Sequence, residues 1–374
     1  MILVLEPNVS QESADYRMLT GQLQRLPNVS FRVHREVGSE VTLTEIYLIG
    51  NTAALTVEQM QVLPCVAKVV RVSEAYRVLG RHQQDDDRAS SFEYNGVHFG
   101  QDGLNVFAGL CAVDSRESAE AMMKALRDNG QVCTRMGAYK PRTSPYAFQG
   151  YGAACLPYVF ELAGRYGIRV ISMEITHESH VDEIRRALEA TGNATGVMLQ
   201  IGTRNTQNFE LLKLVGKQQE FPVLIKRGFG ITLDESLNAT EYLATEGNRK
   251  VVFCLRGMKT NMGDPHRNFV DFSHVPVVKR LTRMPVAIDP SHSVGTRARA
   301  PDGLLDIFHA VAQGVVAGAN MILVDFHPDP ARALVDGPQA LLLSELPHFL
   351  ADVAIAREAY ESRARLAREQ GLAH

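Results

Sequence analysis

The sequence lacks several features that would assign it to a specialised class of protein. No apolar run approaches the roughly 20 residues that a membrane span requires. The first residues, Met1–Glu6, are apolar, but they are too few and carry no basic start, so they do not resemble a signal peptide. With a formal net charge of −3, the chain also lacks the basic excess from which nucleic-acid binding begins. We therefore predict a cytoplasmic protein that has neither a membrane nor a nucleic acid as its partner.

Cysteine is also sparse, and its distribution argues against disulfide bonds. The five cysteines are odd in number and widely separated: Cys65, Cys111, Cys133, Cys155 and Cys254. A disulfide framework needs an even set of closely spaced cysteines in a secreted chain. We therefore expect a reducing compartment and free thiols.

Residues 1–80 predict a small separate domain. The segments expected to form strands are Met1–Glu6, Val29–Val37, Glu45–Gly50 and Val66–Val72. Gln11–Leu26 carries apolar residues at helical spacing, and Thr56 can cap a second helix that runs to Leu63. The resulting βαββαβ order is that of a ferredoxin-like domain, a module that commonly senses a ligand or packs against a larger domain.

A polar segment separates this domain from the rest of the chain. Residues 81–88 offer nothing to bury, so they predict a linker. Phe92–Phe99 follows with Asn95-Gly96 at its centre, the dipeptide typical of a tight β-hairpin. We therefore divide the chain into a ferredoxin-like domain at 1–80, a linker and hairpin at 81–103, and a large domain at 104–374.

The large domain alternates eight apolar runs with helical patterns. The expected strands are Asn105–Val113, Val132–Tyr139, Arg169–Ile175, Gly196–Ile201, Pro222–Arg227, Lys250–Arg256, Pro285–Asp289 and Met321–Phe326. The expected helices are Ser115–Asn129, Leu156–Tyr166, Val181–Ala190, Asn208–Lys217, Leu233–Thr245, Leu305–Ala317, a segment from Leu346 onward and, less clearly, Phe272–Arg283. Consecutive apolar residues are typical of strands covered on both faces, and eight such units over roughly 250 residues predict a (β/α)8 barrel. The alternative is an open doubly wound sheet, but the sequence lacks the glycine fingerprint of its dinucleotide-binding form.

The stretch Lys140–Gly150 has the most distinctive composition in the chain. Pro141 has a fixed φ and stands between Lys140 and Arg142, directly after a predicted strand. The hydroxyls of Thr143 and Ser144 follow. This set of donors suits a phosphate or a carboxylate.

Charged residues collect at the carboxyl ends of the predicted strands, where (β/α)8 barrels carry their functional groups. These residues are Cys111, Arg135, Lys140, Glu174, Arg204, Lys226, Arg227, Arg256, Asp289, His292 and Asp325. Six of them are cations, although the chain as a whole is negative. Because like charges gather at a cost unless an anion joins them, the cluster predicts a multiply charged, phosphorylated substrate.

A second set of residues mixes the ligand types of a transition metal. The set consists of Cys111, His292, Asp325 and Asp336. A thiolate, an imidazole and two carboxylates suit Mn, Fe, Co or Zn better than Mg or Ca. His327 competes with His292 for this role, because it also lies near a strand end.

Several stretches resemble the 3-deoxy-D-arabino-heptulosonate 7-phosphate (DAHP) synthases of type I that carry an N-terminal ferredoxin-like domain. They are Lys140–Gly150, Leu199–Phe209, Leu224–Gly228, Asp289–His292 and His327–Pro330. The resemblance covers nearly the whole chain, and the Lys-Pro-Arg-Thr-Ser stretch is its most specific part. The family condenses phosphoenolpyruvate with erythrose 4-phosphate, the first step of the shikimate pathway to aromatic amino acids.

The resemblance also implies roles for individual residues. Phosphoenolpyruvate would be bound by Arg135, Lys140, Arg204, Lys226 and Arg256, and the aldose phosphate by Arg142, Thr143 and Ser144. A divalent metal would be held by Cys111, His292, Asp325 and Asp336. It would polarise the aldehyde or activate the attacking water. Catalytic roles fall to Lys140, Cys111 and His292, with Lys140 as the proton donor to the forming alkoxide.

Four positions depart from the family pattern. Position 325 is usually Glu, and the Asp325 found here reaches one methylene less far. Leu110, Met136 and Leu255 stand where Pro, Gly and Glu are usual. We expect these changes to crowd the strand ends near the metal and the sugar, and to affect the choice of aldose.

Two other functions remain open alternatives. One is a sister condensation of phosphoenolpyruvate with another aldose phosphate, such as arabinose 5-phosphate. The other is a homologue that binds phosphoenolpyruvate without turning it over. The resemblance further implies that residues 1–80 are a regulatory domain with an aromatic effector and that residues 104–374 are the catalytic barrel. It also implies a homo-oligomer, either a tetramer or a dimer.

Overall fold

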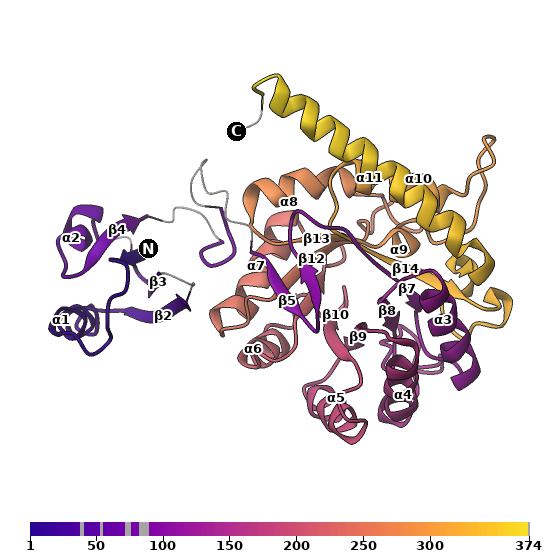
Figure 1. Cartoon of the computed structure of the whole chain (residues 1–374), viewed down its shortest axis with the longest axis horizontal. Helices are drawn as coiled ribbons and strands as arrows, with labels where there is room; N and C mark the ends of the chain where they lie inside the picture. The colour runs from indigo at the N-terminus through magenta and orange to yellow at the C-terminus, as the bar shows by residue number, and fades with distance from the viewer. Residues whose placement is uncertain (38–40, 53–54, 72–75, 82–89, 373–374) are drawn as a thin grey trace. The chain divides into compact units, whose positions relative to one another are not determined.

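The computed structural model describes residues 1–37, 41–52, 55–71, 76–81 and 90–372. The chain forms two compact units, Met1–Asp86 and Asp87–His374, which Figure 1 colours from indigo to yellow along the sequence. From residue 82 onward, the predicted linker at 81–88 lies outside the described residues.

The N-terminal unit is a four-stranded antiparallel sheet with two helices. Its elements are β1 (Ile2–Leu5), α1 (Ala14–Leu23), β2 (Val29–Val37), β3 (Thr42–Gly50), α2 (Val57–Gln61) and β4 (Val66–Val70). The hydroxyls of Ser13 and Thr56 begin the two helices by accepting hydrogen bonds from backbone N–H groups of the first turn. Leu3, Leu19 and Ile46 lie in its core. The strand order β2-β3-β1-β4 is that of the predicted ferredoxin-like fold.

The second unit is built on a closed parallel barrel of eight strands. They are β7 (Asn105–Leu110), β8 (Cys133–Met136), β9 (Val170–Ile175), β10 (Gly196–Ile201), β11 (Val223–Lys226), β12 (Val251–Leu255), β13 (Val286–Ile288) and β14 (Met321–His327). Each pairs in parallel with the next, and β14 also pairs with β7, which closes the barrel. Every residue of β8, β10, β11, β12, β13 and β14 is buried, as expected for strands covered on both faces.

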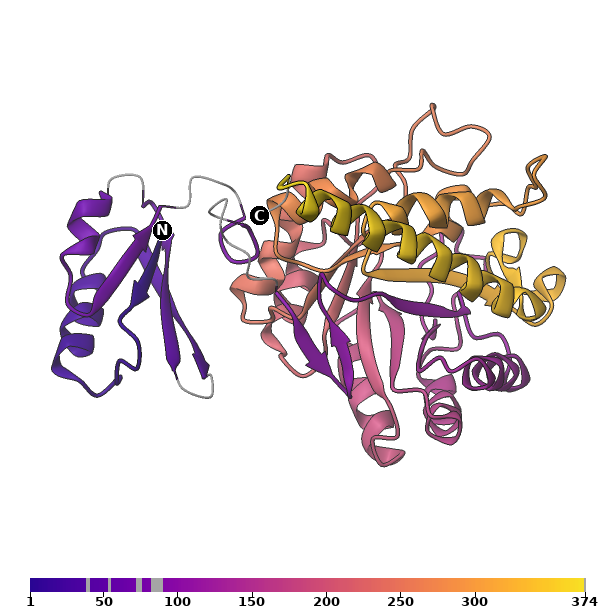
Figure 2. The same ribbon diagram turned by 45° about the horizontal axis from the view of Figure 1, so that its top comes forward.

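Helices surround this barrel, as Figure 2 shows from a second side. They are α3 (Arg116–Asp128), α4 (Leu156–Tyr166), α5 (Ser179–Ala190), α6 (Phe209–Lys217), α7 (Leu233–Thr245), α8 (Val275–Leu281), α10 (Asp306–Val316) and α11 (Leu346–Glu369). The (β/α)8 prediction is therefore confirmed. The sequence did not reveal the shortest elements, which are β15 (Leu341–Leu342), α9 (Pro290–Val294) and single 3-10 turns at 152–155, 272–274, 330–332, 337–339 and 343–345. Among the described residues, no helix has the length and apolarity of a membrane span.

A β-hairpin seals the amino-terminal end of the barrel. Its strands are β5 (Phe92–Tyr94) and β6 (Val97–Phe99), and they are joined by Asn95-Gly96, both with positive φ. The Tyr94 hydroxyl accepts a hydrogen bond from the backbone N–H of Val197 at 3.0 Å. Val97 and Phe99 belong to one buried cluster with side chains from inside the barrel, namely Phe107, Cys133, Val170, Met198, Leu224, Val252, Cys254, Ala287, Met321 and Leu323. The predicted hairpin is thus the floor of the barrel.

Removing a buried aromatic side chain from this hairpin is expected to destabilise the barrel. Phe99 is 2% exposed, so Phe99→Ala should lower the free energy of unfolding by about 3–5 kcal/mol, through lost burial and the cavity left behind. Urea unfolding followed by circular dichroism measures the change. Glu93→Ala on the exposed side of the same hairpin is the control, expected to stay within about 0.5 kcal/mol. Equal stability of the two variants would contradict a role for the hairpin in the core.

Candidate active site

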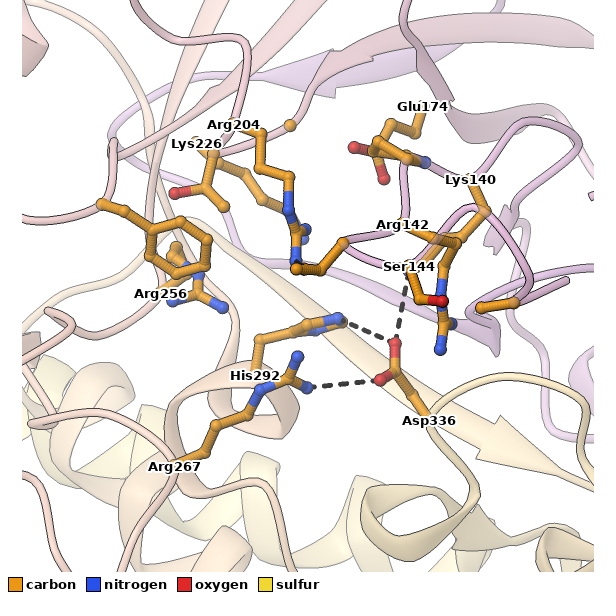
Figure 3. A pocket seen from close by; sticks show the side chains of 16 residues that line it. Lys140, Arg142, Ser144, Glu174, Arg204, Lys226, Arg256, Arg267, His292 and Asp336 are labelled. Carbon is orange, nitrogen blue, oxygen red and sulfur yellow. Dashed lines mark hydrogen bonds and ion pairs between the residues drawn. The ribbon is translucent and has the colours of Figure 1, made fainter. Parts of the chain in front are cut away.

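A cavity of about 260 Å³ opens at the carboxyl ends of the strands, which we call the barrel mouth. Figure 3 shows cationic side chains pointing into it from several strands and loops. The cations that line it are Lys140, Arg142, Arg204, Lys226, Arg256 and Arg267, and the acids are Glu174 and Asp336. The volume is that of a site for small molecules. Its lining therefore favours small, highly charged anions.

Two deeply buried cations differ in how their charge is compensated. Lys226, at the end of β11, forms an ion pair with the Asp289 carboxylate at 2.5 Å. Arg256, directly after β12, is only 1% exposed, and its Nε and Nη1 have no hydrogen-bond partner among the residues that the structure describes. Burial lowers the pKa of Arg256 below its usual value, which reflects the cost of an uncompensated charge. An anion in the cavity would supply the missing partner.

The ring of Phe229 lies beside three cations, of which Arg204 and Arg256 line the mouth. The guanidinium carbons of Arg256 and Arg204 lie 4.7 Å and 5.5 Å from its centroid, and Lys259 Nζ lies at 5.8 Å. Contacts of this kind attract a cation to the ring face and restrict its position. Phe229 is therefore a platform that directs Arg204 and Arg256 while leaving their hydrogen-bond donors available.

The Lys140–Gly150 stretch forms the outer rim of the cavity. Lys140 N–H donates to the carbonyl of Gln149 at 2.8 Å, which closes the stretch into a loop. Gly150 completes this loop at φ +90°, where a Cβ atom would lie 2.1 Å from the carbonyl oxygen of Ala138. Thr143 is exposed, and its hydroxyl accepts a hydrogen bond from Arg204 Nη2 at 3.2 Å. The rim is thus joined to the opposite wall of the mouth.

Beneath the rim, four side chains gather as potential metal ligands. Single ligand atoms of Cys111, His292, Asp325 and Asp336 all lie within 4.8 Å of one another. Cys111 Sγ lies 3.0 Å from Asp336 Oδ2 and 3.6 Å from His292 Nε2, and this nitrogen is 3.4 Å from the same oxygen. Figure 3 shows Asp336 also paired with Lys140 and Arg267.

Asp289 fixes the orientation of the His292 ring. Its carboxylate caps the short helix α9 by accepting from His292 N–H, and it also lies 3.0 Å from His292 Nδ1. The other ring nitrogen, Nε2, therefore faces Cys111 and Asp336. Burial alone would lower the pKa of His292, but Asp289 and Asp325 raise it to about 10. The surroundings thus favour positive charge at this point.

The donor set fits a divalent transition metal. A thiolate, an imidazole and carboxylates are the ligands that Mn, Fe, Co and Zn accept. Asp336 is held ionised, because His292 and Lys140 outweigh its burial and keep its pKa well below the usual value. The Lys140 ammonium lies 2.6 Å from Cys111 Sγ and so touches both the cluster and the cavity. The cluster could therefore hold a metal at the edge of the anion site.

Two residues considered from the sequence lie elsewhere. His327 Nε2 lies 2.6 Å from Asp114, away from the ligand cluster. Arg227 does not line the cavity, because its guanidinium donates to the buried carboxylate of Asp271 at 2.9 Å. Both lie at strand ends, but their side chains pair with carboxylates that do not line the mouth.

The expectation that substituted positions crowd the mouth is wrong for three of them. Leu110, Met136 and Leu255 are fully buried, and none lines the cavity. They are packed within the barrel wall at the ends of β7, β8 and β12. The cavity is therefore shaped by other residues.

Sequence reasoning missed two residues of the mouth, Arg267 and Phe229. Arg267 lies in the long loop after β12, and its guanidinium donates to Gln339 Oε1 at 2.9 Å. Phe229 follows the end of β11 by three residues, a position that could have drawn attention to it. Its contacts with three cations join the loops after β10 and β12, which the sequence does not bring together.

Comparisons with known proteins agree with this architecture. Residues 81–360 match the family described as the DAHP synthetase I family, and residues 1–74 match the DAHP synthase ferredoxin-like domain. A phospho-2-dehydro-3-deoxyheptonate aldolase from Thermotoga maritima is 35% identical over 342 residues, covering 91% of this chain and 93% of the relative. A 2-dehydro-3-deoxyphosphooctonate aldolase from Bradyrhizobium sp. is 28% identical, covering 68% of this chain and 88% of that protein.

Solved structures show the same relationship. The crystal structure of a phospho-2-dehydro-3-deoxyheptonate aldolase (DAHP synthase) from Thermotoga maritima superposes with a TM-score of 0.68 at 31% identity, covering 96% of this chain and 97% of that one. A truncated form of 3-deoxy-D-arabino-heptulosonate 7-phosphate synthase from the same organism gives a TM-score of 0.61 over 80% of this chain and 98% of its own.

Because Nε and Nη1 of Arg256 have no hydrogen-bond partner among the described residues, Arg256 provides a test of the anion site. Inorganic phosphate at about 100 times its Kd should raise the free energy of unfolding of the wild type by about 2.7 kcal/mol. Arg256→Met should lose most of this stabilisation, because the substitution removes the buried guanidinium that would bind the phosphate. Thermal unfolding with and without phosphate measures it, with Arg280→Met on the exposed side of α8 as the control. Equal stabilisation of both variants would place the anion elsewhere.

Proposed function

The chain belongs to the DAHP synthetase I family, whose reaction condenses phosphoenolpyruvate with erythrose 4-phosphate, and we propose that the barrel mouth divides this chemistry among three groups of residues. The first group binds phosphoenolpyruvate, the second binds the aldose phosphate, and the third holds a metal. The single observation that carries this division is Arg256, a buried cation that lines the cavity and whose Nε and Nη1 have no hydrogen-bond partner among the described residues.

Phosphoenolpyruvate occupies the deep part of the cavity. Its phosphate and carboxylate are bound by Arg135, Lys140, Arg204, Lys226 and Arg256. Lys226 and Arg256 are almost fully buried, so their charges act in a poorly screened environment. Two anionic groups on one small molecule match this concentration of cations, and the fixed donors orient the reacting carbon.

The aldose phosphate occupies the rim. Arg142, Thr143 and Ser144 supply a cation and two hydroxyls, and Lys140 lies between the rim and the deep site. In the condensation, C3 of phosphoenolpyruvate forms a bond to the aldehyde carbon, and the aldehyde oxygen takes a proton. Lys140 is the donor of that proton. Water adds at C2, and cleavage of the C–O bond there releases inorganic phosphate.

The metal is Mn, Fe, Co or Zn, held by Cys111, His292, Asp325 and Asp336. When bound, it polarises the aldehyde or activates water. Cys111 and His292 contribute to catalysis through the metal. Lys140 holds its ammonium against Cys111 Sγ and borders the cavity, so the proton donor is fixed beside both the ligand cluster and the substrates.

Erythrose 4-phosphate, and not a larger aldose, is the sugar substrate that the similarity over the whole length of the chain favours. The heptonate aldolase from Thermotoga matches 91% of the chain, whereas the octonate aldolase from Bradyrhizobium matches only 68%. Leu110, Met136 and Leu255 lie outside the cavity lining, so the rim residues remain free to accept the smaller sugar.

The N-terminal domain binds an aromatic effector, and the protein is a homo-oligomer, a tetramer or a dimer.

A direct assay tests the reaction. Phosphoenolpyruvate and erythrose 4-phosphate should be consumed together, with release of inorganic phosphate. The loss of the enol absorbance measures the consumption of phosphoenolpyruvate. A chelator should stop the reaction, and Mn, Fe, Co or Zn should restore it, because the ligand cluster lies beside the substrates. Arabinose 5-phosphate is the control aldose. Consumption with this sugar alone would identify the sister reaction, and binding of phosphoenolpyruvate without turnover would identify a non-catalytic homologue.

The Phe229 platform gives a second test. Phe229→Leu keeps an apolar side chain but removes the ring face, so about 0.5–2 kcal/mol of cation–π attraction is lost. The KM for phosphoenolpyruvate should rise, with a smaller change in kcat. Steady-state kinetics measure both, with Phe229→Tyr expected to behave as the wild type. Phe209→Leu, on the outer helix α6, is the control for general effects. An unchanged KM in Phe229→Leu would exclude the platform.

A further inference from the structure

We propose that His180 is a positioning residue for Lys140, and that it acts by joining the chain after β8 to the chain after β9. His180 is the second residue of α5, and it does not line the cavity of the barrel mouth. This role rests on the function proposed above and deepens it, since it explains how the proton donor is held in place. Two contacts of the His180 ring support it.

The first contact is with Tyr139, the residue directly before Lys140. The rings of Tyr139 and His180 are stacked, with their centroids 3.6 Å apart and their planes inclined by 10°. The Tyr139 hydroxyl donates a hydrogen bond to Glu183 Oε2 at 2.6 Å, one turn further along α5. Glu183 Oε1 in turn accepts a hydrogen bond from Ser179 Oγ at 3.1 Å. Buried Tyr139 is thus fixed at both its ring face and its hydroxyl.

The second contact is with the backbone that follows β9. His180 Nδ1 accepts a hydrogen bond from Thr176 N–H at 3.2 Å. A ring nitrogen accepts only when it carries no proton, so this contact requires the neutral imidazole with its proton on Nε2. Burial lowers the pKa of His180 below its usual value, and nearby His177 adds to this effect, whereas the charge of Glu183 opposes it. The imidazole is therefore neutral at pH 7, as the contact demands.

Both chain segments that His180 joins carry side chains of the cavity. Lys140 follows Tyr139 directly, Glu174 precedes Thr176 by two residues, and both Lys140 and Glu174 line the mouth. Lys140 also begins the rim, which its N–H closes onto the carbonyl of Gln149. A shift of Tyr139 would therefore move the ammonium that donates the proton. Displacing a reacting group by about 1 Å can cost roughly 100-fold in rate.

Two substitutions separate the contacts of His180. His180→Phe keeps a ring that can stack on Tyr139 but removes the acceptor for Thr176 N–H. His180→Asn keeps a short side-chain acceptor but removes the ring. His309→Phe, on the outer helix α10, is the matched control, because the His309 side chain is 42% exposed. Steady-state kinetics compare the full-length, metal-loaded proteins, and thermal unfolding confirms that each variant is folded at the assay temperature.

The expected result is a loss of turnover with little loss of phosphoenolpyruvate binding. Both His180 variants should lower kcat about tenfold, because a misplaced ammonium slows the proton transfer. The KM for erythrose 4-phosphate should rise, since the rim begins at Lys140. The KM for phosphoenolpyruvate should stay within about twofold, because the other cations of the deep site also bind it. A merely structural role would lower the unfolding temperature without this division between the two KM values, and His309→Phe should behave as the wild type.

A double-mutant cycle tests whether His180 acts through Tyr139. Tyr139→Leu removes the ring on the other side of the stack, so combining it with His180→Asn should lower kcat by less than the product of the single effects. Fully multiplicative effects, or a kcat within about twofold of the wild type in both His180 variants, would overturn the inference. A wild type that binds phosphoenolpyruvate without turning it over would instead contradict the proposed function.

Discussion

The buried carboxylate of Asp289 is the contact on which the barrel mouth depends. It pairs with Lys226, caps helix α9 and holds Nδ1 of His292, all without exposure to solvent. A buried carboxylate alone would cost several kcal/mol, and so would either of its partners. Lys226 and His292 keep the pKa of Asp289 well below its usual value despite its burial. One carboxylate thus joins the anion site to the metal ligands.

The same rule of compensation distinguishes the buried cations that the protein itself pairs with a carboxylate from Arg256. Arg227 is compensated by Asp271 and Arg135 by Asp325, so both are fixed by the protein itself. Arg256 has only the ring of Phe229 beneath it, and its Nε and Nη1 lack partners among the described residues. The fold therefore tolerates an unfavourable charge at one position, and a bound anion relieves it. This distinction requires coordinates, because Arg135 lies within an apolar strand and Arg227 and Arg256 directly follow one, so the sequence gives all three similar surroundings.

The sequence predicted what depends on periodicity and missed what depends on loop geometry. The eight strands, the major helices and the hairpin follow from apolar runs and one Asn-Gly turn, because burial imposes these patterns locally. Cys111, His292, Asp325 and Asp336 were grouped by residue type and resemblance, and the structure brings them within 4.8 Å. The partners of Asp325 could not be predicted, since Arg135 and Gln339 are 190 and 14 residues away along the chain. Phe229 and Arg267 were missed for the same reason.

The hairpin that seals the amino-terminal end of the barrel has a consequence for how molecules enter and leave the cavity. The barrel interior is itself filled by buried side chains such as Phe107 and Met198, and the hairpin covers their amino-terminal end, so molecules reach the cavity from the side of the rim. Lys226 and Arg256 are nearly inaccessible, whereas Thr143 and Ser144 are exposed. A molecule seated at the rim blocks the path to the deeper position. In the proposed arrangement, the ligand of the deep position would therefore have to enter before the ligand of the rim, and the rim ligand would leave first.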